Sequence, residues 1–295
     1  MSRFEKWLRD VDLRNAGKPS DATRRLAQRV VAPVVRLLWR PTISGTEHFP
    51  TDRPFLLVAN HSAGVGLAEI LSLASLYLDR GTTWATIPIA GFAHPAGFAS
   101  PAGRWVHRHV GSVPSTRDAA LECLSRGISV LVFPGGDHES LSPIWRANQV
   151  DFAGRTGFLK LALEAQVPIV PLAIRGGAYT APIVARGKWL ATAFVLPTLL
   201  FGVKRWGISV FGLSVAAGIL AVTPAPLPVR IFMAWVWLGT PLVFLPIVPW
   251  NIRFVVGEPI DLAELFSVEQ NDDTAARLRS ALSLVERRLQ ELIDG

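Results

Sequence analysis

Short apolar runs alternate with helix-like segments between residues 54 and 174, and this alternation constrains the fold more than any other feature of the sequence. The runs have the length and β-branched content of buried strands, whereas the segments between them have helical spacing. The predicted strands are 55–59, 83–87, 128–133 and 167–174, and the predicted helices are 69–78, 117–126 and 157–165. Such alternation favours an α/β fold, a largely parallel sheet flanked by helices.

A polar Asn60-His61 pair follows the first predicted strand, where the chain would leave a parallel sheet at its carboxyl edge. Glu69 begins the next predicted helix, eight residues after His61, and is placed to fold back onto the imidazole. A histidine held by a carboxylate can take a proton from a hydroxyl at neutral pH. We therefore predict that His61 and Glu69 are catalytic. The alternatives are a histidine that caps the helix and an acid that only favours the helix dipole.

The third strand, 128–133, leads into Pro134-Gly135-Gly136-Asp137, at the same predicted edge of the sheet. Two glycines let the backbone approach a ligand closely, so these four residues are predicted to bind substrate. A plain tight turn is the alternative. The neighbouring side chains of Asp137, His138 and Glu139 form a second, weaker candidate for an acid–base pair.

Arg117 is the strongest candidate for a phosphate ligand, because a guanidinium presents a planar fork that matches phosphate oxygens. It stands at the start of a predicted helix, and a surface arginine is the alternative. Arg146, Arg155 and Arg175 are weaker candidates for the same role.

Composition narrows the possible partners. The chain is 50% hydrophobic and 18% charged, with a net charge of +7 and one cysteine, Cys123. Positive charge combined with high hydropathy points to an anionic membrane surface or phosphate-bearing substrates, and no nucleic-acid recognition motif is present. A single cysteine excludes an intramolecular disulfide and a thiolate metal site. The N-terminus lacks the apolar core of a secretory signal, so we expect a membrane-associated protein on the cytoplasmic face.

Residues 189–250 form an apolar insertion that we expect to associate with the membrane. No charge occurs at 206–229 or at 231–252. Each stretch reaches the roughly 20 residues of a spanning helix, but prolines interrupt both. The pattern favours a region that dips into one leaflet, with spanning helices as the alternative.

The expected organisation has four parts. An N-terminal basic amphipathic helical region occupies 1–40, with a helix capped by Asp21 and kinked at Pro33. It either lies in a membrane interface or packs on its own domain. The α/β core occupies 41–188 and the insertion 189–250. Residues 251–295 return to the core with a final strand at 251–256 and an amphipathic helix at 274–293.

Four of these blocks, taken together, resemble the glycerolipid acyltransferase superfamily, the PlsC-like or lysophospholipid acyltransferases. The blocks are Asn60-His61 with a following acid, Gly111 to Arg117, Val132 to Asp137 and Val167 to Ile174. Two positions depart from the family pattern: Gly66 replaces the usual Asp, and Gly135 replaces the usual Glu. The Pro-Gly-Gly turn and the segment 154–158 are similar to the diacylglycerol acyltransferase 2-like branch.

The resemblance implies a PlsC-like fold and an O-acyltransferase that moves a fatty acyl group from acyl-CoA or acyl carrier protein to a glycerolipid hydroxyl. It implies His61 as the general base and no bound cofactor or metal, with a bilayer, an acyl donor and a lipid acceptor as partners. An acyltransferase for neutral lipids, acting on diacylglycerol or a fatty alcohol, is the alternative. A non-catalytic lipid-binding membrane protein is a second alternative. A serine hydrolase is less favoured, since its nearest motif is residues 212–216 within an uncharged stretch.

Overall fold

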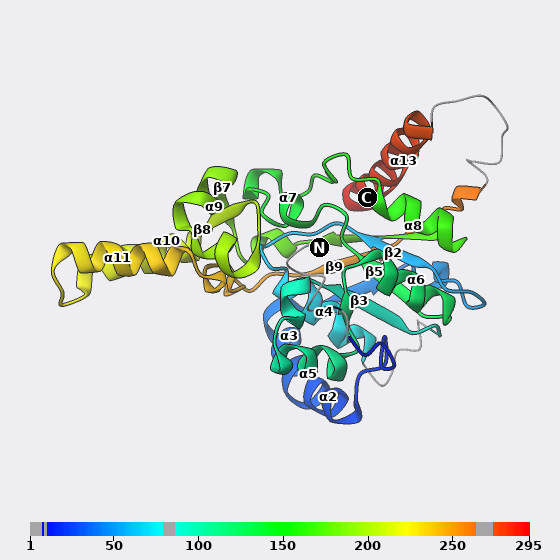
Figure 1. Cartoon of the computed structure of the whole chain (residues 1–295), viewed down its shortest axis with the longest axis horizontal. Helices are drawn as coiled ribbons and strands as arrows, with labels where there is room; N and C mark the ends of the chain where they lie inside the picture. Colours follow the sequence, from blue (N-terminus) through cyan, green and yellow to red (C-terminus); the bar gives the residue numbers. More distant parts are fainter. Residues whose placement is uncertain (1–7, 9–10, 79–85, 264–273) are drawn as a thin grey trace.

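The centre of the computed structural model is a seven-stranded sheet (Figure 1), and the residues described are 8, 11–78, 86–263 and 274–295. The strand order is β1-β9-β6-β2-β5-β3-β4. All neighbouring strands are parallel except β6 and β9, which are antiparallel. The strands are β1 Thr42–Ser44, β2 Leu56–Ala59, β3 Ile89–Ala93, β4 Val113–Pro114, β5 Ser129–Val132, β6 Ile169–Arg175 and β9 Arg253–Val256. The largely parallel α/β sheet predicted from the alternating pattern is therefore confirmed.

Helices cover both faces of this sheet (Figure 1). α3 Ala32–Trp39 and α4 Leu67–Tyr77 lie on one face, and α6 Arg117–Ser125, α8 Gly157–Ala165 and α13 Thr274–Asp294 lie on the other. The chain also forms the helices α2 Asp21–Leu26, α5 Pro101–Val110 and α7 Gly136–Ser140. Alternate strand residues enter two separate apolar cores. Leu56 and Val58 pack with α6, α8 and α13, whereas Leu57 and Ala59 pack with α3 and α4. The two-residue period of a strand thus explains why continuous apolar runs are needed here.

Three local expectations differ from the structure. The strand expected at 83–87 falls largely outside the described residues, and the chain enters the sheet later, at Ile89. Ser20 rather than Asp21 caps α2, because its hydroxyl accepts a hydrogen bond from the Thr23 N–H at 3.2 Å. The helix, expected to kink at Pro33, is interrupted slightly earlier, by a π-helical turn, η1 Ala27–Val31, just before that proline. Proline has no N–H to donate, which favours this change of pattern.

A second unit follows β6 and has its own apolar core, which includes Leu190, Trp206 and Phe244. It contains the antiparallel ribbon of β7 Ile183–Gly187 and β8 Trp206–Ser209, with α9 Lys188–Phe194 and η7 Pro241–Phe244. Two further helices, α10 Val210–Val222 and α11 Leu227–Leu238, pack on each other and project away from the sheet (Figure 1). In the described part of the chain, no helix combines the length and apolar character needed to cross a membrane.

Candidate functional site

The structure brings together His61, which follows β2, and Glu69, which lies in the first turn of α4. The Nδ1 of His61 and Oε2 of Glu69 are 2.8 Å apart, and the two side chains are 12% and 1% exposed. The Ser62 N–H also donates to Glu69 Oε2, at 3.2 Å, and the Ser62 hydroxyl donates to Oε1. Glu69 is therefore a buried carboxylate with three donors, a setting in which its charge is well compensated.

The glycine at position 66 explains why the acid of this pair comes from position 69. Gly66 has a φ of +62°, and a Cβ built on it would overlap the imidazole of His61. An aspartate at position 66 has no room in this arrangement. Because Glu69 lies one helical turn further on, its longer side chain reaches Nδ1 from the side.

Asn60 fixes the position from which His61 leaves the sheet. Its Nδ2 donates to the carbonyl of Ile174 at 2.9 Å, and the Ile174 N–H donates to its Oδ1 at 2.7 Å. This pair of hydrogen bonds ties the end of β2 to β6. The buried amide therefore acts as an extra rung of the sheet, directly before the imidazole.

The hydrogen bonds determine which nitrogen of His61 can accept a proton. Because Nδ1 is engaged by the Glu69 carboxylate, Nε2 is the ring nitrogen left to exchange a proton with a ligand. The imidazole also packs against Phe133 at the end of β5, with ring centroids 4.5 Å apart. The ring is thus held on one edge and one face.

A second buried carboxylate, Glu139, lies on the other side of His61. Its Oε2 accepts the backbone N–H of His61 at 3.0 Å, and its Oε1 accepts the Asp151 N–H at 3.3 Å. Burial raises the pKa of Glu139 well above its ordinary value, and the charge of Glu69 acts in the same direction. A Cβ built on Gly135 would fall on the Glu139 side chain. The sequence pattern places Glu139 only in the weaker acid–base candidate, because its contact with the His61 backbone joins segments 78 positions apart.

The Pro134-Gly135-Gly136-Asp137 turn leads from β5 into α7, and Arg155 holds it. The guanidinium donates to the Pro134 carbonyl at 3.1 Å, to the Gly135 carbonyl, and to Asp137 Oδ1 at 2.7 Å. Gly136 has a φ of +46°, and a Cβ there would approach this guanidinium. Through Glu139 the turn adjoins His61, so the two candidate segments do meet at one edge. Substrate binding by these four residues stays a prediction.

The acid–base pair considered among Asp137, His138 and Glu139 does not form. Asp137 binds Arg155, and Glu139 binds the His61 backbone. His138 Nε2 instead meets Asp151 Oδ2 at 2.8 Å. That interpretation was wrong because side chains adjacent on a short helix point in different directions.

Arg117 begins α6, as its position predicted, and its partner is a carboxylate. Its guanidinium binds Glu164 of α8 and lies 3.6 Å from Asp118. More than half of the Arg117 side chain is exposed. None of the contacts described for Arg117 involves the residues around His61. Its role as a phosphate ligand remains a prediction.

The described residues contain no arrangement suited to serine hydrolysis or to metal binding. Ser214, the centre of the possible hydrolase motif, lies inside α10, where its hydroxyl donates to the Val210 carbonyl at 3.0 Å. A nucleophile elbow needs a strand-to-helix turn instead. Among the described side chains, no three His, Cys, Asp or Glu residues gather as potential metal ligands.

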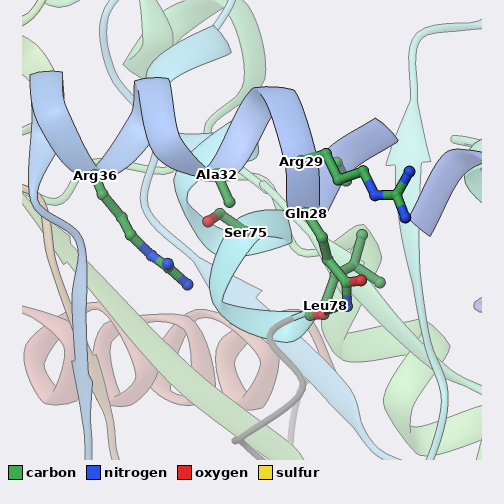
Figure 2. A pocket seen from close by; sticks show the side chains of 7 residues that line it. Gln28, Arg29, Ala32, Arg36, Ser75 and Leu78 are labelled. Carbon is green, nitrogen blue, oxygen red and sulfur yellow. Dashed lines mark hydrogen bonds between the residues drawn. The ribbon is translucent and has the colours of Figure 1, made fainter. Parts of the chain in front are cut away.

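A separate pocket of about 310 Å³ lies between the N-terminal helices and α4 (Figure 2). Its lining consists of Ala27, Gln28, Arg29, Ala32, Arg36, Ser75 and Leu78. Gln28 closes one side, where its Nε2 donates to the Leu78 carbonyl at 2.7 Å. No residue of the His61–Glu69 pair lines this pocket, so it belongs to the N-terminal helical region and not to the edge that carries His61.

Comparison with known proteins gives one family and several partial relatives. Residues 40–175 match the family model described as Acyltransferase. A solved structure, that of the 1-acyl-sn-glycerophosphate (LPA) acyltransferase PlsC from Thermotoga maritima, superposes with a TM-score of 0.45 at 19% identity. That superposition covers 91% of this chain and 79% of that chain.

The similar curated proteins are longer than the matched region. An uncharacterized protein of Mycobacterium tuberculosis is 30% identical over 57% of this chain and 47% of its own length. The human protein named DGAT1/2-independent enzyme synthesizing storage lipids is 26% identical, over 44% of this chain and 38% of its own. The mouse 1-acyl-sn-glycerol-3-phosphate acyltransferase alpha is 28% identical, over 45% and 44%. The chain thus spans less than half the length of these relatives. Residues 40–175, a little under half of the chain, match the acyltransferase family that the motifs predict.

Proposed function

We propose that this protein transfers a fatty acyl group from an acyl thioester to the hydroxyl of a glycerolipid, with His61 as the general base. The observation that carries the proposal is the 2.8 Å contact between His61 Nδ1 and a Glu69 carboxylate that is 1% exposed. The contact orients the imidazole and leaves Nε2 available to a substrate hydroxyl. The match of residues 40–175 to the acyltransferase family model supports the reaction class.

In the proposed reaction, Nε2 of His61 takes the proton of the acceptor hydroxyl while its oxygen attacks the thioester carbonyl. A C–O bond forms, and the C–S bond breaks when the tetrahedral intermediate collapses. The leaving thiolate then takes the proton from the imidazolium. Glu69 stabilises that imidazolium through Nδ1–H. A positioned base of this kind contributes on the order of 10²–10⁴-fold to the rate.

We further propose that the α10–α11 hairpin associates with the bilayer. It exposes apolar side chains on both helices, namely Val210, Leu213, Leu220, Val222, Leu227, Val229, Ile231, Phe232 and Met233. Thirteen helical residues extend about 20 Å at 1.5 Å per residue, less than the roughly 30 Å hydrocarbon layer. A hairpin of this length reaches into one leaflet. Exposed apolar side chains gathered on one hairpin are typical of an interaction site.

One observation favours the neutral-lipid acceptor as a second candidate. The Glu expected at position 135 is absent, and the Glu139 side chain fills the space above Gly135. The acceptor therefore meets a different surface here than the family pattern provides. One relative is itself named as an enzyme synthesizing storage lipids.

The test uses labelled acyl-CoA with a panel of lysophosphatidic acid, other lysophospholipids, diacylglycerol and a fatty alcohol. We expect His61→Ala to abolish transfer and Glu69→Gln to reduce it by about 10²-fold or more, because the imidazole loses its orienting carboxylate. His109→Ala is the matched control, since the described side-chain contacts of His109 are with Trp105 of its own helix, through its carbonyl and its ring.

Equal transfer by wild type and by folded His61→Ala protein would remove His61 as the base. The acceptor consumed by the wild type decides between the phospholipid and the neutral-lipid candidates. Repeating the assay with labelled acyl-acyl carrier protein shows which of the two thioesters is the acyl donor. A wild type inactive with both donors would favour the lipid-binding alternative.

A further inference from the structure

A row of three polar residues crosses the sheet at the end of β6, on the face that α13 covers. The strand register places Thr42 on β1 beside Arg253 on β9, and Arg253 directly opposite Arg175 on β6. Val255 and Ala173, each two positions from one of these arginines, pack in the core on the α13 face. Because residues two apart on a strand share a face, both arginines belong to that side of the sheet.

The two arginines of this row form an unfavourable pair, because like charges directly opposite each other on antiparallel strands repel. Among the residues that the structure describes, neither Arg175 nor Arg253 has a side-chain hydrogen bond or an ion pair. Glu291 on α13 lies nearby, but its described ion pairs are with Arg287 and Arg288 of its own helix, at 3.9 and 3.3 Å. The fold thus places two positive charges side by side without an acidic side chain bound to them.

The row lines a groove of about 380 Å³ between the sheet and the end of α13. Ser44, two residues after Thr42 on β1, also lines it, so two hydroxyl groups accompany the two guanidinium groups. A guanidinium carries five N–H donors, and each hydroxyl carries one O–H donor. Several donors and two positive charges in one groove suit an anion that has several oxygens.

The groove is separate from the pair that carries the proposed chemistry, although one strand connects them. Neither His61 nor Glu69 lines the groove, and the helix that bears Glu69 packs on the other face of the sheet. Arg175 nevertheless follows Ile174, whose backbone is held by Asn60 through two hydrogen bonds. A ligand bound to Arg175 therefore also fixes the strand end that holds Asn60.

We propose that this groove binds a doubly charged phosphate, either free or as the phosphomonoester of a small soluble molecule, with Arg175 and Arg253 as its ligands. The site is additional to the acyl-transfer reaction and does not depend on it. Guanidinium forks match phosphate oxygens, and a phosphomonoester carries close to two negative charges at neutral pH. Because the anion replaces repulsion between the arginines with attraction to both, its binding stabilises the folded chain.

The experiment measures calorimetric binding and thermal unfolding of the detergent-solubilised full chain, with chloride holding the ionic strength constant. The probes are inorganic phosphate, glycerol 2-phosphate as a phosphomonoester, and glycerophosphoglycerol as the soluble, singly charged headgroup of a phospholipid. Arg175→Gln removes one guanidinium, and Arg175→Lys keeps the charge but loses the fork. Arg25→Gln, at an exposed position on α2, is the control for losing one positive charge elsewhere.

We expect phosphate or its monoester to bind the wild type and raise its Tm. Arg175→Gln is expected to weaken that binding about tenfold and to remove most of the rise in Tm, because one fork is lost. Arg175→Lys should recover part of the binding, and Arg25→Gln should leave it unchanged. Tighter binding of the monoester than of inorganic phosphate identifies an organic ligand, and equal binding identifies free phosphate.

Three results would overturn the proposal. They are no binding by the wild type, equal affinities in the wild type and Arg175→Gln, and tighter binding of glycerophosphoglycerol than of either doubly charged probe. The last result would assign the groove to a lipid headgroup. The Tm of each variant in chloride alone shows that it is folded, and His61→Ala protein is expected to bind phosphate as the wild type does.

Discussion

Two glycines close to the candidate base have acidic side chains beside them that come from one helical turn further along. Gly66 lies against the imidazole, and Glu69 supplies the carboxylate; Gly135 lies under the carboxylate of Glu139. Separations of three and four residues place side chains on the same face of a helix. Positions 66 and 135 thus carry no acid, and α4 and α7 instead bring the carboxylates of Glu69 and Glu139 next to His61.

Because Gly66 lies close to the His61 imidazole, adding a single methyl group at this position is expected to affect activity. Gly66→Ala is expected to reduce acyl transfer at least about tenfold, because the new Cβ displaces the imidazole from Glu69. Gly127→Ala is the matched control: Gly127 also has a positive φ, of +73°, but no atom lies within 4 Å of the position that a Cβ would take there. Both variants incur the left-handed backbone cost of roughly 1–2 kcal/mol.

Activity normalised to the folded fraction, from thermal unfolding of each variant, is the measurement. Equal activities of the two alanine variants would show that contact with His61 is not the reason for the glycine.

Sequence reasoning found His61 and Glu69 because both lie near strand and helix ends, where local pattern places them. It ranked Glu139 low and Arg155 only as a weaker phosphate candidate. Glu139 reaches the His61 backbone across 78 positions of sequence, and Arg155 reaches the Gly135 carbonyl across 20. Such contacts depend on which strands become neighbours, and a single sequence does not carry that information in its local spacing.

At the scale of elements, the bounds of α8 agree with the helix predicted at 157–165, because Gly157 and the apolar spacing mark it clearly. The region after β6 was less predictable. Its lack of charge indicated an apolar insertion, but its local composition gave no sign of the β7–β8 ribbon. The pairing of β7 with β8 across α9 is a non-local contact, so only the folded chain reveals it.

The α10–α11 hairpin and the N-terminal helix are two candidate membrane contacts, and one pair of variants separates them. Phe232→Glu is expected to reduce binding to anionic vesicles strongly, because Phe232 is 61% exposed on α11 and would lose apolar burial in lipid. Leu37→Glu changes a residue that is 73% exposed on α3 and is expected to have a smaller effect. Vesicle flotation at low and high salt is the measurement.

A larger loss of vesicle binding for Leu37→Glu than for Phe232→Glu would assign the membrane contact to the N-terminal helix. Complete release of the wild type from vesicles by salt alone would contradict insertion of the hairpin and indicate that the protein binds lipid only electrostatically.

At the scale of the whole molecule, the sheet depends on a strand near the C-terminus. β9 lies between β1 and β6, where Phe254 pairs with Ile43 on one side and with Ile174 on the other. Phe254 is buried in the core on the α3 and α4 face. The helix α13 that follows packs on the opposite face. Both ends of the chain thus contribute to one sheet.

Phe254→Ala is accordingly expected to lower the free energy of unfolding by about 3–5 kcal/mol, as large-to-small changes in cores do. Arg253→Ala, an exposed neighbour on the same strand, is expected to change it by less than about 0.5 kcal/mol. Denaturant titration of the two variants is the measurement. A similar small effect for both would mean that β9 is not required for the stability of the sheet.

The position of β9 near the C-terminus also determines which elements are synthesised before the sheet is complete. Residues 210–238 of the hairpin are synthesised before residues 253–256, so the nascent chain presents its apolar helices while β1 and β6 still lack the strand that joins them. An unpaired strand edge is prone to associate with other chains. If the hairpin contacts a bilayer early, as proposed, that contact would hold the unfinished sheet apart from other nascent chains until its last strand arrives.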